Sequence, residues 1–251
     1  NKQAAADAAV QEYVPTGDPS NVKAALSSVE PGTGRIVAMS QNTNYGLATE
    51  EDSSTTQISF SADASHGGLE NTDGTSGFQP GSTFKAFVLA EWYQEGHSGY
   101  ETMNTSPATF GPSSWRISCD PSKADTWTVG NANASEGGTH NVIQNTAMSI
   151  NVGFARMTQQ MDICDITRMA ANLGVTTNSG QALTPTPSIA LGSQEVTPLQ
   201  MASAYATFAA HGVYCRPIAI DSITDADGKP TEVPSAGCTQ AMDGTAADKT
   251  A

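Results

Sequence analysis

The sequence is poor in positive charge. Its 251 residues include 11 lysines and arginines against 25 aspartates and glutamates, and the formal net charge at pH 7 is −14. Binding to nucleic acid or to an anionic membrane surface requires clustered Lys and Arg, so the composition argues against both partners. Charged residues make up only 14% of the chain, and much of the other polar content is Ser, Thr, Asn, Gln and Gly. Such a composition suits an extracytoplasmic protein.

Long apolar segments are missing too. No run approaches the roughly 20 apolar residues that span a bilayer, and no signal peptide is present. If the protein is exported, we expect its targeting segment and any membrane anchor upstream of Asn1. The first residue is not Met, which favours a trimmed or excised domain. The length allows one sizeable hydrophobic core or two small ones.

Metal-binding spacing is also absent. No two cysteines form C-x-x-C, and no histidine stands at ligand spacing from a cysteine, so we predict no metal site and no cofactor. Cys215 and Cys238 flank a predicted hairpin, and a disulfide between them is one interpretation. Cys119 and Cys164 would then pair by elimination, although four cysteines allow three connectivities. Four unpaired buried thiols are the alternative.

Turn residues and hydrophobic patterning divide the chain into short elements. We expect helices over 1–10, 84–92, 139–161, 163–173 and 199–210, strands over 22–29, 35–40, 216–223 and 231–233, a turn-rich linker over 15–21, and irregular chain over 41–79 and 98–138. Both strand pairs would be antiparallel hairpins. We find no internal repeat. Residues 1–21 are interpreted as a linker from an upstream domain, and residues 22–251 as one domain.

An apolar helix with one anomalous charge follows a Pro-Gly turn. The run 84–92 is apolar on nearly every face, and Ser82 is placed to begin the helix. Lys85 lies one turn after Ser82 on the same face. Burial disfavours a charged lysine, and the positive end of the helix dipole favours a negative serine oxygen. The pattern predicts a nucleophile, Ser82, with Lys85 as its base. A serine cap followed by a lysine that extends to solvent is the alternative.

A second polar motif interrupts the helix predicted over 139–161. Ser149 and Asn151 lie at this break, 67 and 69 positions after Ser82 (149 − 82 and 151 − 82). A Ser–Lys mechanism uses a second hydroxyl to relay a proton to the leaving amine, and an amide to bind the substrate backbone. The alternative is a polar junction between two helices.

These motifs resemble those of a known family. Residues 78–85 and 149–151 resemble the first two active-site motifs of penicillin-binding proteins. The segment 190–208 is similar to the signature helix of their transpeptidase domains, and 29–39 to the strand pair that opens the domain. The pieces occur in the family's order. The motif sequences are most similar to those of the bifunctional class A enzymes, whose glycosyltransferase domain would precede Asn1.

The resemblance implies an α/β (α+β) fold of the serine β-lactamase and penicillin-binding transpeptidase type, with a five-stranded antiparallel sheet between helical layers. Only the early strands would be present, because the family's third motif, Lys-Thr/Ser-Gly, is missing. Its one candidate, 249–251, lacks the glycine and falls where we expect a helix to start. We therefore expect the domain to be incomplete at its C-terminus. The remaining C-terminal segment would supply one oxyanion-hole N–H and the groups that hold the substrate carboxylate.

The activity implied by the resemblance is D,D-transpeptidation on the outer face of the bacterial cell membrane. Ser82 would attack the stem peptide's D-Ala-D-Ala end and Lys85 would take its proton. Ser149 would pass a proton to the departing D-Ala, and Asn151 would orient the peptide and Lys85. β-Lactam antibiotics would acylate Ser82. Two alternatives stay open, a serine β-lactamase, whose usual helper glutamate is not found after Asn151, and a non-catalytic peptidoglycan-binding or sensor module.

Overall fold

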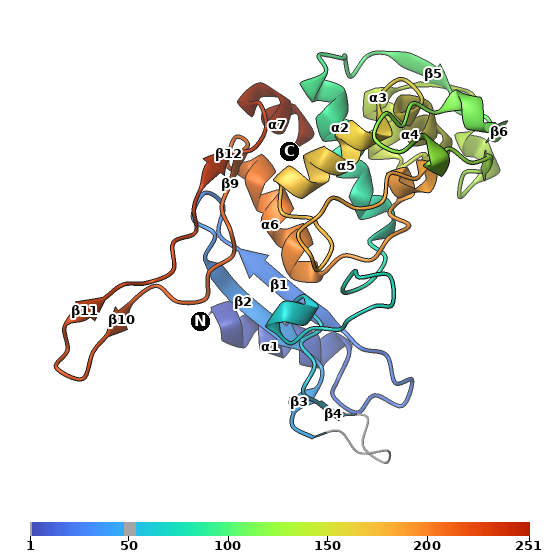
Figure 1. Cartoon of the computed structure of the whole chain (residues 1–251). Coiled ribbons are helices and arrows are strands. Elements are labelled where there is room, and N and C mark those ends of the chain that lie inside the picture. The colour runs from blue at the N-terminus through green and yellow to red at the C-terminus, as the bar shows by residue number, and fades with distance from the viewer. Residues whose placement is uncertain (1, 48–53) are drawn as a thin grey trace.

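The computed structural model describes residues 2–47 and 54–251 (Figure 1). The helices are α1 (Lys2–Tyr13), α2 (Lys85–Gln94), α3 (Val142–Ala147), α4 (Asn151–Thr158), α5 (Ile163–Asn172), α6 (Pro198–Ala209) and α7 (Gly244–Thr250). The strands pair as β1 (Ala25–Val29) with β2 (Ile36–Gln41), β3 (Asn44–Tyr45) with β4 (Thr55–Thr56), β5 (Thr102–Asn104) with β8 (Thr139–Asn141), β6 (Ala108–Phe110) with β7 (Trp127–Val129), β9 (Val213–Tyr214) with β12 (Thr239–Gln240), and β10 (Ile223–Thr224) with β11 (Pro230–Thr231). Among the described residues no sheet has more than two strands.

The hairpin of β1 and β2 lies between helices and is antiparallel, as predicted. Helix α1 packs on β2 and α6 packs on β1, so the strand pair has a helical layer on each side (Figure 1). The Gln3 side chain fixes α1 to the strand by hydrogen bonds to the backbone N–H and C=O of Met39. The chain therefore has a mixed α/β architecture. Of the expected five-stranded sheet, the described residues contain this hairpin alone.

Helix α2 is the centre of the hydrophobic core and contacts α4, α5 and α7. Phe87, Val88 and Trp92 are fully buried, as its all-round apolar sequence predicts. Each such side chain contributes about 1.5–3 kcal/mol on burial. The helix stops at Gly96, whose φ of +87° is readily adopted only by glycine. This buried position makes α2 a rigid support for residues at its N-terminus.

The interrupted helix predicted over 139–161 differs from the structure mainly at its start. Its first residues form β8, and Asn141 then caps α3 in a capping box. The expected break lies at 148–150, between α3 and α4. Gly153 is inside α4 and lets the helices approach, since a Cβ there would lie 2.4 Å from Cγ of Asn145.

Other predicted boundaries also change. The stretch 98–138 is not wholly irregular, because it contains β5, β6 and β7, and Trp115 packs between Phe110 and Trp127. The last residues, 249–251, end α7 and do not start a helix. Because they are at a helix end, they do not form the strand on which the family's third motif would lie.

Both disulfides of the first interpretation are present. Cys119 is bonded to Cys164 and Cys215 to Cys238, with S–S distances of 2.01 and 2.12 Å. The bridges close loops of 45 and 23 residues. Bridges of this kind typically add about 2–4 kcal/mol to stability. The alternative of four free thiols is wrong, and the first bridge fixes the loop after Trp115 to the N-terminus of α5.

Candidate active site

Ser82 lies on a turn of 3₁₀ helix, η2 (Gly81–Phe84), that leads directly into α2. It therefore does not cap α2, which begins at Lys85 with Phe84 at the cap position. The Ser82 side chain is exposed, and its hydroxyl has no hydrogen-bond partner within residues 2–47 and 54–251. Such a hydroxyl is available to a substrate.

The segment before α6 holds this turn in place. Phe78 and Val196 exchange two backbone hydrogen bonds of 3.0 and 2.9 Å. The Gly81 N–H donates to the carbonyl of Gly192. A Cβ on Gly192 would lie 2.3 Å from the carbonyl oxygen of Gly81, so glycine is required for this close approach.

Side chains add to this support. The Tyr205 hydroxyl, on α6, donates to the carbonyl of Thr83 at 2.9 Å. The Gln79 amide donates to the carbonyl of Ser193 at 3.0 Å. The segment 190–208, which resembles the signature helix of the family, positions the turn that carries Ser82.

Lys85 is the first residue of α2 and only 4% exposed. Its amine donates to the carbonyl and hydroxyl of Ser149 at 2.6 and 3.0 Å, and to Oδ1 of Asn151 at 2.7 Å. It also lies 5.3 Å from the centre of the Phe154 ring. The structure thus brings three of the four predicted site residues into one hydrogen-bonded group. Ser149 and Asn151 lie 64 and 66 positions after Lys85 in the sequence. The fourth, Ser82, precedes Lys85 by one turn.

Burial lowers the pKa of Lys85 to about 8, and the opposing charge of Glu136 keeps it from falling further. An amine with that pKa is about one-tenth neutral at pH 7, compared with well under one in a thousand at an ordinary lysine value. The shift supplies the basic form that proton abstraction needs. The alternative of a lysine extended to solvent is wrong.

Ser149 lies in the break between α3 and α4 with a φ of +54°. This left-handed conformation is uncommon for a residue with a Cβ and costs of order 1 kcal/mol or more. Both the carbonyl and the hydroxyl of Ser149 accept hydrogen bonds from Lys85. The polar junction between α3 and α4 therefore contacts the buried amine directly.

A loop that the sequence did not single out fixes Asn151. Its Nδ2 donates to the carbonyl of Gly130 at 3.2 Å. Oδ1 of Asn131 accepts from the N–H of Val152 at 3.0 Å, and Asn131 Nδ2 donates to the carbonyl of Thr105 at 2.8 Å. Asn131 thus holds the N-terminus of α4. A lone asparagine in a polar loop carries no sequence signal for this role.

Glu136 is the second residue that sequence reasoning missed. It is 7% exposed, and its Oε1 accepts a 2.6 Å hydrogen bond from Nδ2 of Asn133. Its negative charge favours the protonated form of Lys85. The site therefore contains a buried carboxylate whose charge raises the pKa of the Lys85 amine.

The sequence matches one protein family over most of its length. The profile of the family described as "Penicillin binding protein transpeptidase domain" matches residues 25–250. Penicillin-binding protein 1A of Mycolicibacterium smegmatis is 27% identical over 240 residues, which cover 90% of this chain and 26% of that protein. Penicillin-binding protein 1A of Aquifex aeolicus is 29% identical over 154 residues, covering 61% of this chain and 19% of that protein. The chain thus spans about a quarter or less of the length of these relatives.

Solved structures share the fold. PonA1 of Mycobacterium tuberculosis, solved in complex with penicillin V, matches with a TM-score of 0.73 and 22% identity over 99% of this chain and 59% of that chain. Penicillin-binding protein 3 of the same organism, complexed with aztreonam, matches with a TM-score of 0.69 and 20% identity, over 99% of this chain and 54% of that one. At these identities the likeness concerns the fold.

Proposed function

The chain belongs to the penicillin-binding protein transpeptidase domain family, and from this premise we propose that it carries the nucleophile and base of a peptidoglycan D,D-transpeptidase. The observation that carries the proposal is the buried amine of Lys85, bonded to Ser149 and Asn151 one turn after Ser82. We also propose that residues 22–251 belong to the transpeptidase domain and that 1–21 lead from an upstream domain.

In the proposed reaction, Lys85 removes the proton of the Ser82 hydroxyl. The Ser82 oxygen attacks the carbonyl carbon of the penultimate D-Ala, and the backbone N–H of Ser82 donates to the developing oxyanion. The C–N bond breaks, Ser149 relays the proton held by Lys85 to the departing D-Ala amine, and an ester on Ser82 remains. An amine of a neighbouring stem peptide then attacks this ester. The proton that this amine loses returns to the Ser82 oxygen through Lys85, so the products are a new amide cross-link and free Ser82. Asn151 orients the peptide throughout.

The same chemistry would make β-lactams inhibitors. Penicillin-binding protein A of Mycobacterium tuberculosis has been solved as an imipenem acyl-enzyme complex, which supports the proposal for a chain of the same fold. A β-lactam carbonyl attacked by Ser82 would open its ring and keep its amine attached. With no departing amine, the acyl-enzyme would persist.

The hydrolytic alternative, a serine β-lactamase, needs a carboxylate that activates water beside the ester. Glu136 is the buried carboxylate whose field acts on Lys85 in this chain. It precedes Asn151 in the sequence, whereas the usual helper glutamate of a serine β-lactamase lies in a loop that follows this motif. Hydrolysis therefore remains the second candidate, and the labelling experiment below distinguishes the two.

We place the protein outside the cytoplasm. Its four cysteines are all paired, and disulfides persist in oxidising compartments. Among the described residues no helix has the length and apolarity that crossing a membrane would require. We propose that any anchor lies on a segment outside this chain.

Fluorescent penicillin V tests the function. The experiment uses this chain and, in parallel, a chain extended with a segment that carries Lys-Thr/Ser-Gly, since no such sequence occurs in the 251 residues. A stable one-to-one adduct in the extended chain supports the transpeptidase. Rapid release of opened penicillin supports the β-lactamase alternative. The absence of an adduct and of turnover in the extended chain would leave the non-catalytic peptidoglycan-binding or sensor module.

Asn151→Ala is expected to slow acylation by penicillin by about 10²-fold or more, as the loss of a transition-state hydrogen bond does. The substitution removes the acceptor for Lys85 and the donor to Gly130, and the fold should persist because Asn131 still holds α4. Stopped-flow or time-course labelling measures the rate, with Asn44→Ala on β3 as control. Acylation at the wild-type rate would show that Asn151 has no part in acylation and serves only as a polar residue at the junction of two helices.

Glu136→Gln is expected to move the acidic limb of the acylation rate to lower pH. The negative charge of Glu136 favours protonated Lys85, so removing it lowers the pKa of Lys85 below about 8 and frees the basic amine at lower pH. Gln keeps the side-chain shape and an acceptor for Asn133. Labelling rates between pH 5.5 and 9 measure the limb, with Glu232→Gln on the exposed hairpin as control. A limb that stays in place, or moves to higher pH, contradicts the coupling.

A further inference from the structure

A second cluster of charged side chains lies at the other end of α2, away from Ser82. Glu91 and Glu95 are one turn apart near the C-terminus of this helix, and Asp165 is in the first turn of α5. One carboxylate oxygen from each residue can be chosen so that the three lie within 4.8 Å of one another. Like charges at this spacing repel, so the arrangement is unfavourable unless something compensates it.

Glu91 is the member that most needs a partner. Its side chain is 8% exposed, and no hydrogen bond or ion pair to it occurs within residues 2–47 and 54–251. Burial, with Glu95 and Asp165 beside it, raises the pKa of Glu91 to about 7. A buried carboxylate without a partner costs several kcal/mol when it is ionised. Glu91 is therefore a mostly buried acid that meets solvent only at the cavity it lines and has no ion-pair partner among the described residues.

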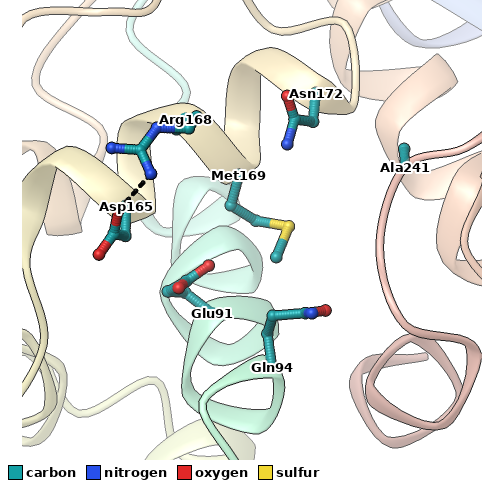
Figure 2. Close-up of a pocket in the computed structure, with 7 residues that line it drawn as sticks. All are labelled: Glu91, Gln94, Asp165, Arg168, Met169, Asn172 and Ala241. Atoms are coloured by element: carbon teal, nitrogen blue, oxygen red, sulfur yellow. Dashed lines mark hydrogen bonds and ion pairs between the residues drawn. The ribbon is translucent and has the colours of Figure 1, made fainter.

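The Glu91 side chain lines a cavity of about 140 Å³. Figure 2 shows it between α2 and α5, with the amides of Gln94 and Asn172 on the side toward Ala241. Amide oxygens are further ligands that hard cations accept. Oε1 of Gln94 already accepts from the N–H of Asp243 at 2.9 Å and has a second lone pair to offer.

The two nearby basic residues, Arg168 and His97, are close to other carboxylates and form no ion pair with Glu91 among the described residues. Arg168 forms its ion pair with Asp165 across the first turn of α5, and its side chain is mostly exposed (Figure 2). His97 lies 3.9 Å from Glu95. Neither contacts Glu91 among the ion pairs of the described residues.

We propose that Glu91, Glu95 and Asp165 form a binding site for a divalent cation of the oxygen-seeking class, with Ca²⁺ as the fitting ion. Two ligand oxygens can be no farther apart than twice the metal–oxygen distance, about 4.6–5.2 Å for Ca²⁺ and about 4.0–4.2 Å for Mg²⁺. The three carboxylate oxygens lie within 4.8 Å of one another, which is inside the limit for Ca²⁺ with the side chains as they stand. The bound ion would satisfy Glu91 and join α2 to α5 behind the site of acylation.

The test is metal-dependent stability, which does not require activity. The 251-residue chain is treated with EDTA, dialysed, and unfolded by heat with 5 mM CaCl₂, 5 mM MgCl₂, or NaCl of matched ionic strength. For a dissociation constant near 0.5 mM, typical of extracellular calcium sites, we expect Ca²⁺ to raise Tm by about 3–6 °C. Titration calorimetry with CaCl₂ measures the affinity directly.

Substitutions separate this site from general salt effects. Glu91→Gln is expected to weaken Ca²⁺ binding at least tenfold, and without Ca²⁺ it should be as stable as the wild type, since it removes the buried charge. Glu95→Gln should also weaken binding, and Glu232→Gln should behave as wild type. No Ca²⁺-dependent rise in Tm, or the same rise in wild type and Glu91→Gln, would overturn the proposal. An equal response to Mg²⁺ would overturn the assignment to Ca²⁺.

Discussion

Ser82→Ala is expected to abolish labelling by penicillin, lowering the acylation rate by about 10⁴–10⁶-fold, the range seen when a covalent nucleophile is removed. The substitution deletes the only atom that can form the ester. It should change stability by no more than about 0.5 kcal/mol, because the Ser82 hydroxyl is exposed and has no hydrogen-bond partner within the described residues. Mass spectrometry of the extended chain after reaction with penicillin V measures the adduct.

The matched control is Ser122→Ala, at another serine on an exposed 3₁₀ turn. It should label as the wild type does. Peptide mapping of the labelled wild type should place the adduct on Ser82. An adduct on any other residue, or labelling that survives in Ser82→Ala, would refute Ser82 as the nucleophile.

Lys85→Arg is expected to be as inactive as Ser82→Ala although its charge is kept. A guanidinium stays protonated at every accessible pH and cannot take the Ser82 proton. Lys85→Ala should be inactive as well. It should also be destabilised by about 1–3 kcal/mol, because the carbonyl of Ser149 and Oδ1 of Asn151 lose their donor.

The pH dependence gives Lys85 a second test. Since burial lowers the pKa of Lys85 to about 8, the wild-type acylation rate should rise with pH and level off above about 8. The arginine variant should show no such rise. Lys229→Arg, on the exposed hairpin, should keep the wild-type profile. An arginine variant that labels at the wild-type rate would exclude Lys85 as the base.

Local chemistry was enough to predict several elements. Thr197 followed by Pro198 is a local signal for a helix start, and the Thr197 hydroxyl accepts a hydrogen bond from the Gln200 N–H at the start of α6. The all-round apolar run 84–92 predicted a buried helix, and the pairing of β1 with β2 followed from two strand patterns around one turn. These signals are readable because caps, turns and periodicity act over a few neighbouring residues.

Only part of the chemistry of the site could be predicted from the sequence. The sequence indicated Ser82 and Lys85 from their spacing and Ser149 and Asn151 from a helix break. It could not show that the amine of Lys85 would contact the last two, which lie more than sixty positions away. Nor did it indicate Glu136, whose effect on the pKa of Lys85 depends on burial.

The position of Ser82 could not be predicted from its neighbours in the sequence. A serine after Pro-Gly was expected to cap a helix, whereas Ser82 lies within a 3₁₀ turn held by Gly192 from a segment 110 residues later (192 − 82). The sequence alone determines which residues can serve as nucleophile, base and hydrogen-bond donor, because that is a property of each side chain. Their distances, burial and pKa values depend on contacts between segments far apart in the chain, and those contacts exist only once the chain has packed around α2.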